Sequence, residues 1–397
     1  MSEKLIGSGR LGLTVDWAIE KLKNSCSNFQ QKLKNGLTVK EVVSTKLSGD
    51  SGFMSDVYRC DVHFNGGTED DTLAYCLKEP SSERMDKILG FDFFPFLKDM
   101  HQRECSFYEI FGKTEGLKTP KVFGTKLLTD EDKNGYIFME FCGSGHHRPI
   151  DIAKSLNLEQ VLSVVENIAH LHAFALKNKS AWDGQFKSVN IVASTVKECD
   201  EVFGRLVGRL KTFCDEDLMA RVEDLRDIFF NADIYNYILY DAHKEAGVPS
   251  IISHGDLWAN NILFEVDKKT DELTNTVGGI VDWQATNAGN PAQDLVRIML
   301  LNMDADVRHA SEPKVFAHYY QKLNEYLKEL NADPASFSLE QLLNAAKPYF
   351  LYQLVLAMFI SAHSFHGENQ VGKRAIFLER LREGLKQAQK TKHLWQK

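Results

Sequence analysis

The sequence lacks the cysteine pattern and the leader that mark secreted proteins. Its seven cysteines are an odd, scattered set in 397 residues, and no two of them form a Cys-x-x-Cys pair. This pattern argues against a disulfide framework and against a zinc site, and it favours a reducing compartment. The first residues do not contain the apolar core of a signal peptide. We therefore expect a cytoplasmic protein.

Long apolar runs and a surplus of positive charge are also missing. The most apolar stretch, residues 349–362, contains Gln353 and is too short to cross a bilayer, so it predicts a buried helix. The net charge is −8, which argues against a nucleic-acid or anionic-membrane partner. A hydrophobic content of 43% with 26% charged residues is typical of a globular protein. The length allows two lobes, each with its own core.

The sequence does contain the segment His-Gly-Asp-Leu-Trp-Ala-Asn-Asn at 254–261, followed by Val-Asp-Trp at 281–283. Phosphoryl transfer needs one carboxylate to orient and deprotonate a hydroxyl. It also needs an amide and a second carboxylate to hold Mg²⁺ on the nucleotide phosphates. Asp256, Asn261 and Asp282 have these side chains. The bare spacing His-x-Asp-x-x-x-x-Asn is a weak signal by itself, and the residues that follow it make the signal strong.

Two predicted strands place the amide and the second carboxylate together. Residues 262–266 and 276–281 have strand character, and the link between them is polar and turn-like. Strands joined in this way pair antiparallel, so the start of the first lies beside the end of the second. Asn261 directly precedes the first strand and Asp282 directly follows the second. They are predicted neighbours at one end of a hairpin; the alternative is an ordinary hairpin with polar ends.

The first third of the sequence predicts a strand-rich lobe with a phosphate-binding turn. Residues 39–47 and 53–64 have strand patterns and enclose a glycine turn that contains Gly49, Ser51 and Gly52. Backbone N–H groups in such a turn can approach phosphate oxygens. The alternative is a plain hairpin turn.

A lysine and a glutamate in this lobe are predicted partners. Lys78 ends a third strand, residues 73–78, on a face of small residues. Glu104 lies on the apolar face of a helix predicted over 97–113, where an unpaired charge would be costly. An ion pair would satisfy both residues and aim the lysine at the α- and β-phosphates. The alternatives are an exposed strand lysine and a glutamate paired within its helix; Arg103 on the same helix is expected to face solvent.

A further strand over 135–142 ends in a glycine-rich stretch that is the best linker in the chain. Kinase hinges bind adenine through backbone groups, so Glu140, Phe141 and Cys142 are candidates by position alone. We expect a helical N-terminal extension over 1–37, a first lobe over 38–142 and a second lobe over 143–397.

The second lobe is predicted to be mostly helical. His172 falls on an apolar helix face and is expected to be a hydrogen-bonded core residue. Asp294 and Arg297 are expected to brace the catalytic loop. Aromatic residues are concentrated here; they predict either core or the wall of an apolar acceptor pocket: Phe229, Phe230, Tyr235, Tyr237, Tyr240, Tyr349, Phe350 and Tyr352.

These motifs together resemble the ecdysteroid kinase-like family, also called CHK kinase-like, which is related to choline kinases and aminoglycoside phosphotransferases. The resemblance covers roughly residues 38–365, and the Leu-Trp-x-Asn-Asn extension is its most distinctive part. It implies an α+β, two-lobed protein-kinase-like fold with a mostly antiparallel first lobe and a helical second lobe. It also implies ATP and Mg²⁺ as co-substrates and a small-molecule alcohol as phosphate acceptor.

The resemblance also implies a role for each matching residue. Asp256 corresponds to the base, Asn261 and Asp282 to the metal ligands, Lys78 to the nucleotide lysine and Glu104 to its partner. The sequence departs from protein kinases by having His-Gly-Asp for His-Arg-Asp and Trp-Gln for Phe-Gly, and no Ala-Pro-Glu follows. These departures argue against a protein kinase.

Other functions stay open on the sequence alone. A pseudokinase that binds ligands without turnover is one alternative, although the base, metal and lysine residues are all present. A choline or aminoglycoside kinase is another. We expect a lipophilic acceptor such as a sterol or a hydrophobic glycoside. We expect no nucleic-acid, membrane or obligate protein partner.

Overall fold

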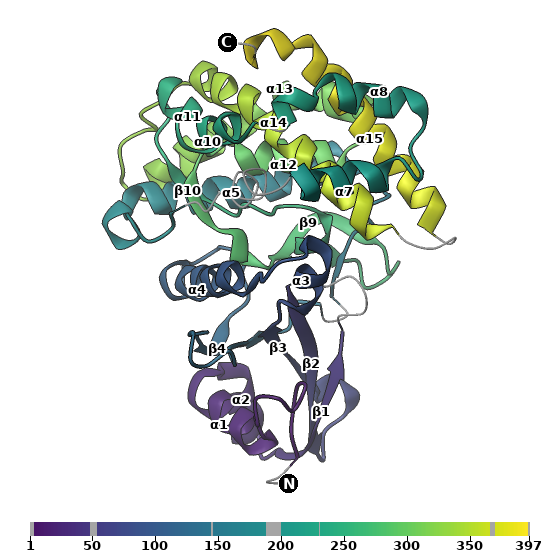
Figure 1. Ribbon diagram of the computed structural model, residues 1–397. Helices are drawn as coiled ribbons and strands as arrows, with labels where there is room; N and C mark the ends of the chain where they lie inside the picture. The colour runs from purple at the N-terminus through teal and green to yellow at the C-terminus, as the bar shows by residue number, and fades with distance from the viewer. Residues whose placement is uncertain are drawn as a thin grey trace. The chain divides into compact units, whose positions relative to one another are not determined.

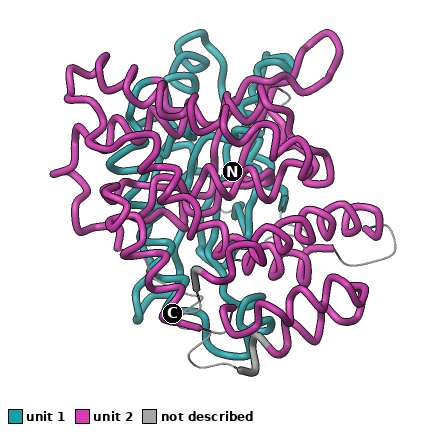
Figure 2. The backbone as a smooth tube through the Cα atoms, turned by 90° about the horizontal axis from the view of Figure 1, so that it is seen from above, with its two compact units in different colours: residues 1–115, 119–145 teal, residues 116–118, 146–397 magenta. Residues whose placement is uncertain are grey.

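The structure, a computed structural model, describes residues 4–47, 54–143, 146–187, 200–229, 231–365 and 370–395. The chain forms two compact units, residues 1–115 with 119–145 and residues 116–118 with 146–397 (Figure 2). The first unit contains an antiparallel sheet and the second is mainly helical, which confirms the predicted α+β class.

The first unit is built on a five-stranded sheet with the strand order β1-β2-β3-β5-β4, and every neighbouring pair is antiparallel. Its strands are β1 (Thr38–Lys46), β2 (Ser55–Asn65), β3 (Leu73–Pro80), β4 (Val122–Lys126) and β5 (Tyr136–Glu140). Alternation in β2 places Tyr58, Cys60, Val62 and Phe64 in the core, because successive side chains of a strand point to opposite faces. The sequence predicts all of these strands except β4, which is short and contains Gly124.

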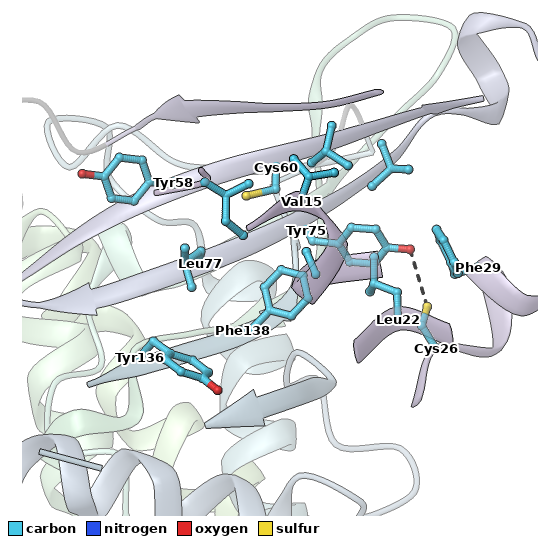
Figure 3. Packing of buried hydrophobic residues seen from close by; sticks show 14 of the residues in the cluster. Val15, Leu22, Cys26, Phe29, Tyr58, Cys60, Tyr75, Leu77, Tyr136 and Phe138 are labelled. Atoms are coloured by element: carbon cyan, nitrogen blue, oxygen red, sulfur yellow. Dashed lines mark hydrogen bonds between the residues drawn. The ribbon is translucent and has the colours of Figure 1, made fainter. Parts of the chain in front are cut away.

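Two N-terminal helices, α1 (Val15–Ser25) and α2 (Ser27–Lys34), complete the core of this unit. Val15, Ala18 and Leu22 recur at helical spacing and are all buried. Figure 3 shows the Tyr75 hydroxyl directed at the Cys26 sulfur, and the two atoms are 3.6 Å apart. The segment predicted as an N-terminal extension thus shares a core with the sheet and is not a separate domain.

The remaining helices of the first unit are α3 (Glu83–Leu89) and α4 (Phe94–Phe111). Met100, Glu104 and Phe107 of α4 are buried, as the helical spacing predicts. The prediction that Arg103 faces solvent is wrong. Its side chain is buried and forms an ion pair with Asp99, one turn earlier in the helix.

The second unit combines helices with small sheets (Figure 1). Its strands are β6 (His147–Pro149), β7 (Ile251–Ser253), β8 (Ile262–Val266), β9 (Leu273–Ile280) and β10 (Asn287–Gly289). Its described α-helices are α5 (Leu158–Lys177), α7 (Asp200–Leu210), α8 (Glu216–Asp224), α9 (Arg226–Phe229), α10 (Ala232–Tyr240), α11 (Ala242–Glu245), α12 (Gln293–Asn302), α13 (Ala305–Glu329), α14 (Leu339–Ser364) and α15 (Val371–Lys390). β8 pairs with β6 and with β9, and β7 pairs with β10.

Helix α5 shows why the sequence folds locally as it does. Asn157 accepts from the backbone N–H of Gln160 at 2.8 Å, and the Gln160 side chain accepts from the backbone N–H of Asn157 at 3.2 Å. This capping box satisfies two of the N–H groups that a helix start leaves open. Farther along, Nδ1 of the buried His172 lies 2.5 Å from the Tyr319 hydroxyl. His172 is therefore a hydrogen-bonded core residue, as predicted.

Among the described residues, α14 is long and apolar enough to cross a membrane by length and composition. However, 67% of its most apolar window is buried inside the fold. Burial of this kind is typical of a core helix, which agrees with the buried helix predicted over 349–362.

Candidate active site

In the first unit, the predicted ion pair between a strand lysine and a helix glutamate is present. Nζ of Lys78 on β3 donates to Oε2 of Glu104 on α4 at 2.6 Å. The two side chains are 6% and 1% exposed, so each charge is removed from water and compensated by the other. The pairing of β3 with β2 and β5 holds Lys78 in the centre of the sheet, opposite Val57 and Ile137. The position of this lysine is thus fixed by two neighbouring strands and one helix.

We expect this pair to show strong thermodynamic coupling. Lys78→Met or Glu104→Gln alone leaves a buried polar group of the other residue uncompensated, and we expect a loss of about 3–5 kcal/mol from the free energy of unfolding. A double-mutant cycle followed by chemical denaturation should give a coupling energy of about 2 kcal/mol. The matched control is the exposed pair Lys98–Asp130 on the same unit, for which we expect less than about 1 kcal/mol. Equal coupling in both cycles would contradict a structural Lys78–Glu104 pair.

The structure describes the predicted hinge residues but not the predicted nucleotide-loop residues. Gly49, Ser51 and Gly52 lie outside the described residues. Glu140 ends β5, its backbone N–H donates to the Lys121 carbonyl at 2.8 Å, and its carboxylate accepts from the Lys121 N–H at 3.3 Å. Phe141 and Cys142, the other two hinge candidates, directly follow Glu140. The guanidinium of Arg59 lies 5.1 Å from the centroid of the Phe141 ring, and burial raises the pKa of the Cys142 thiol to about 12.

In the second unit, the catalytic-loop motif is held by a buried carboxylate on α12. Asp294 accepts from the backbone N–H of His254 at 2.7 Å and from that of Gly255 at 2.9 Å. Burial raises the pKa of Asp294 to about 6, and these two hydrogen bonds oppose the rise. The His254 ring contacts the Val281 carbonyl at 3.0 Å and lies 4.4 Å from the ring of Trp283. Asp294 braces the catalytic loop, as the sequence predicts.

Steric crowding explains why glycine occupies the second position of the His-Gly-Asp motif. Gly255 has φ +81°, a left-handed conformation, and a Cβ at this position would lie 2.2 Å from the Ala285 carbonyl oxygen. A side chain, including the arginine that protein kinases carry here, would collide with this backbone. The departure from the protein-kinase motif is thus required by the local backbone.

Asp256 is contacted by two side chains that orient its carboxylate. Nδ2 of Asn261 donates to the Asp256 carbonyl at 2.8 Å and to Oδ2 at 3.2 Å. Nη2 of Arg297 on α12 forms an ion pair with Oδ1. Removal of water raises the pKa of Asp256 to about 6; Arg297 opposes the rise and the negative charge of Asp282 adds to it. Arg297 therefore contacts the predicted base itself, and its Nη1 is held by Gln353 at 3.1 Å.

The predicted hairpin is present and brings the two metal-ligand candidates to one end. β8 pairs antiparallel with β9, with Ile262 opposite Ile280. Asn261 precedes β8, and its carbonyl accepts from the N–H of Val281, directly before Asp282, at 3.0 Å. Asp282 has φ +67°, a left-handed conformation that aspartate tolerates better than most residues. This backbone turns Asp282 out of the strand at the end where Asn261 lies.

The donor set at this end of the hairpin fits a magnesium ion. The amide nitrogen of Asn261 is engaged by Asp256, so its oxygen is the atom that can bind a cation. Asp282 supplies a carboxylate, and its charge disfavours the ionised form of Asp256, a repulsion that a divalent cation would relieve. One carboxylate and one amide oxygen leave coordination positions for phosphate oxygens and water, as Mg²⁺ requires. Among the described residues, no group of three or more His, Cys, Asp or Glu side chains is arranged for a metal.

Several residues near Asp256 were missed or left open by the sequence. Gln353 belongs to no motif, and the motif Asp282-Trp283-Gln284 does not by itself give Gln284 a role; its amide nitrogen donates to Asp282 at 3.3 Å. Of the aromatic residues, Tyr235 and Tyr349 are buried in the core, whereas Tyr352 is half-buried. Burial raises the pKa of Tyr352 to about 12; Arg297 opposes the rise, and Tyr240 and Asp256 add to it. Tyr352 is thus an aromatic residue placed near the candidate base, and Tyr240 lies near Tyr352. Phe230 lies outside the described residues.

A family model with the description "Uncharacterized oxidoreductase dhs-27", DUF1679, matches residues 76–377. The Caenorhabditis elegans protein "Uncharacterized oxidoreductase dhs-27" is 26% identical over 375 residues, which are 90% of this chain and 43% of that protein. "Uncharacterized kinase-like protein D1044.1" of the same nematode is 21% identical over 267 residues, 66% of each chain. The chain therefore spans less than half of the first relative and about two thirds of the second.

The first relative is named an oxidoreductase, and many oxidoreductases bind a dinucleotide at a Gly-x-Gly-x-x-Gly turn. Residues 7–12, Gly-Ser-Gly-Arg-Leu-Gly, match the spacing Gly-x-Gly-x-x-Gly. In a dinucleotide fold this turn joins a strand of a parallel sheet to a helix. Here it lies within an antiparallel bridge between Leu5 and Thr14, and the neighbouring sheet is antiparallel. Ser8 in this turn hydrogen-bonds the buried Glu79 carboxylate through its N–H and its hydroxyl. The pattern is thus a structural turn.

A solved structure supports a kinase-like fold. The crystal structure of choline kinase from Cryptosporidium parvum aligns with a TM-score of 0.50 at 11% identity and covers 95% of this chain and 97% of that one. Similarity at this identity shows the fold alone, and it confirms the predicted two-lobed architecture. With residues 76–377 matched by the family model and a choline kinase-like fold, the chain belongs to the DUF1679 family of kinase-like proteins.

Proposed function

We propose that the protein is an ATP- and Mg²⁺-dependent kinase that phosphorylates a hydroxyl group of a small molecule. The observation that carries the proposal is the cluster in the second unit. Asp256 is hydrogen-bonded to Asn261 and paired with Arg297, and Asp282 lies at the same end of the β8–β9 hairpin. Phosphoryl transfer depends mainly on positioning and charge, and this cluster supplies a base and a cation site on a rigid backbone.

In this proposal each residue has a task on the acceptor or on the nucleotide. Asp256 accepts the proton of the attacking hydroxyl, while Arg297 and Asn261 fix the orientation of its carboxylate. Asn261 and Asp282 hold Mg²⁺, which when bound neutralises charge on the nucleotide phosphates. Lys78, fixed by Glu104, supplies a positive charge for the phosphates.

The fixed backbone of the catalytic loop favours catalysis over silent binding. Asp294 anchors two consecutive N–H groups before Asp256, so the base does not depend on a phosphorylated segment for its position. A pseudokinase would bind nucleotide without turnover. Product formation in the assay below separates the two proposals, because a pseudokinase gives none with any acceptor.

We propose a lipophilic acceptor because the half-buried Tyr352 lies near Asp256 and belongs to an aromatic cluster. The Tyr352 ring packs edge-on against Tyr235 at 6.1 Å and lies 5.3 Å from Tyr349. Aromatic walls with one polar orienting group are typical of sites for rigid apolar ligands. The cytoplasmic location and the absence of an obligate protein partner are parts of the same proposal.

A panel of acceptors tests the acceptor class. The full chain is incubated with radiolabelled Mg-ATP and, separately, an ecdysteroid, an aryl glucoside, choline and a generic peptide. We expect transfer to the steroid or the glucoside at least about 10-fold faster than to choline or the peptide, since a well-filled apolar pocket contributes more than 1 kcal/mol per buried group. Preferred labelling of choline or the peptide would contradict the lipophilic acceptor and leave the kinase proposal standing.

A further inference from the structure

The second unit contains a cavity of about 350 Å³ between α12, α13, α14 and α15. This size is within the range of small-molecule sites in proteins. Most of its wall is apolar, and the apolar lining residues are Val296, Met299, Phe316, Leu343, Ala346 and Phe350. All four helices carry labels in Figure 1. The cavity can accept an apolar body.

One buried cation lines this cavity. Arg308 on α13 is 2% exposed, and its guanidinium carbon lies 5.0 Å from the centroid of the Phe350 ring. Nη2 contacts the His309 ring at 3.0 Å, whereas Nη1 is buried without a hydrogen-bond partner among the described residues. Burial lowers the pKa of Arg308, and the negative charges of Glu383 and of Glu312, which also lines the cavity, oppose this. A buried guanidinium with an unused donor is costly unless an acceptor reaches it.

A half-buried glutamine with a buried amide oxygen lines the same cavity. Oε1 of Gln387 on α15 also lacks a hydrogen-bond partner among the described residues. A half-turn of the amide presents its nitrogen instead, because the two orientations have nearly the same shape. Glu340 and Lys347 at the rim are exposed and of opposite charge. The half-buried Glu312 also lines the cavity. The buried end therefore offers the guanidinium of Arg308 and the amide of Gln387 as two possible donors.

We propose that this cavity is a second ligand site that binds a small amphipathic monocarboxylate. The carboxylate accepts from Arg308 and from the turned amide of Gln387, as charge-assisted hydrogen bonds favour. The apolar part of the ligand lies against the walls that α12 and α14 provide. A polyphosphate does not suit this site, because it would bring several charges to a single buried cation and an apolar wall.

The site lies behind the helix that holds the candidate base. Asp294 and Arg297 of α12 contact the catalytic loop, while Val296 and Met299 line the cavity. Val296 lies two residues after Asp294, and Met299 lies two residues after Arg297. At roughly 100° per residue, each cavity residue is therefore about 200° around the helix axis from the residue that contacts the loop. α14 also reaches both places, because Gln353 accepts from Arg297 and Phe350 lines the cavity. An occupant therefore packs against two helices that position Asp256.

Binding of decanoate to the full chain, measured by isothermal titration and by the shift in Tm, tests the proposal without nucleotide. We expect one molecule bound per chain, with decan-1-ol and butyrate at least about 10-fold weaker, because each lacks the charge or the apolar body. Arg308→Met should weaken decanoate binding at least about 10-fold. Leu343→Trp should block it by filling the cavity. Lys314→Met, an exposed lysine on the same helix, is the matched control and should bind normally.

The proposal is overturned if decanoate does not bind, if decan-1-ol binds as well, or if Arg308→Met binds decanoate like the unchanged chain. Circular dichroism and Tm measured without ligand establish that each variant is folded. If Arg308→Met does not fold, Gln387→Leu and Leu343→Trp decide, and normal binding by both overturns the proposal. We further expect bound decanoate to change the kcat of phosphoryl transfer by at least about 2-fold. That effect rests on the proposed function, whereas the binding test does not.

Discussion

Replacing Asp256 with asparagine is expected to cut phosphoryl transfer at least about 100-fold while nucleotide affinity stays within a few-fold. A positioned base contributes about 10²–10⁴ to the rate, and the amide cannot take the proton of the attacking hydroxyl. Asparagine has nearly the same shape, so the hydrogen bond from Asn261 and the contact with Arg297 can remain. The measurement is kcat and KM with the preferred acceptor, together with isothermal titration of Mg-ATP.

The matched control is Asp333→Asn, an exposed aspartate of the same unit, which should leave kcat and nucleotide affinity unchanged. Near-normal kcat in Asp256→Asn would remove Asp256 from the role of base. A large fall in nucleotide affinity with unchanged kcat would instead move it to the nucleotide site. A fall in Tm of several degrees would indicate that the Arg297 charge had lost its partner. The fall in kcat would then include the effect of the lost ion pair.

The parts of the site that the sequence predicts depend on local rules. The β8–β9 hairpin follows from two strand-like runs and a polar link, and antiparallel pairing then fixes Asn261 near Asp282. The Lys78–Glu104 pair follows from a different rule: a charge on an apolar helix face needs a partner, and a lysine on a face of small residues can supply it. Neither step requires knowledge of the full fold.

The contacts that the sequence does not predict are those between distant elements. Arg297 is 41 residues beyond Asp256, and Gln353 lies 56 residues beyond Arg297. The spacing of residues along α12 does not predict whether Arg297 braces the loop or contacts the base. Arg297 lies on the same helix face as Asp294, so its position is compatible with either contact. Arg103 shows the opposite failure. Its charge predicts exposure, but its long side chain is buried with the partner Asp99.

The aromatic residues show a further limit of composition. Their helical spacing is equally typical of a core and of a pocket wall, and the structure divides them. Tyr235 and Tyr349 are buried, while Tyr352 lies near enough to Asp256 for the negative charge of the carboxylate to raise the pKa of its hydroxyl. The β4 strand was missed for a related reason, since a short run with a central glycine has little intrinsic strand preference.

α12 emerges as the element that organises the second unit. Through Asp294 it holds the backbone before the base, through Arg297 it orients the base, and through Asn302 it accepts from the Ala259 N–H at 2.8 Å. Its remaining face forms part of the cavity that contains Arg308. A helix that contacts the catalytic loop at three positions can transmit a small displacement to the loop, because packed elements move as units.

Replacing Asp282 with asparagine is expected to weaken Mg²⁺-dependent nucleotide binding by more than about 100-fold. Loss of an outer-shell partner already costs about 10–100-fold in metal affinity, and removal of a ligand charge costs more. Asparagine is chosen over alanine because Asp282 has φ +67°, a conformation that asparagine tolerates and alanine does not. The variant thus removes the charge and keeps the backbone.

The chain offers a matched control for this change. Asp271 also has positive φ, +56°, and its side chain is exposed and pairs with Arg148. Asp271→Asn should therefore bind Mg-ATP normally. Titration of ATP with and without Mg²⁺ separates the metal from the nucleotide. Asp282→Asn should bind metal-free ATP as before and gain little when Mg²⁺ is added, whereas the unchanged chain and Asp271→Asn should gain strongly. Equal Mg²⁺ enhancement in all three proteins would show that Asp282 does not bind the metal and that the end of the β8–β9 hairpin serves another purpose.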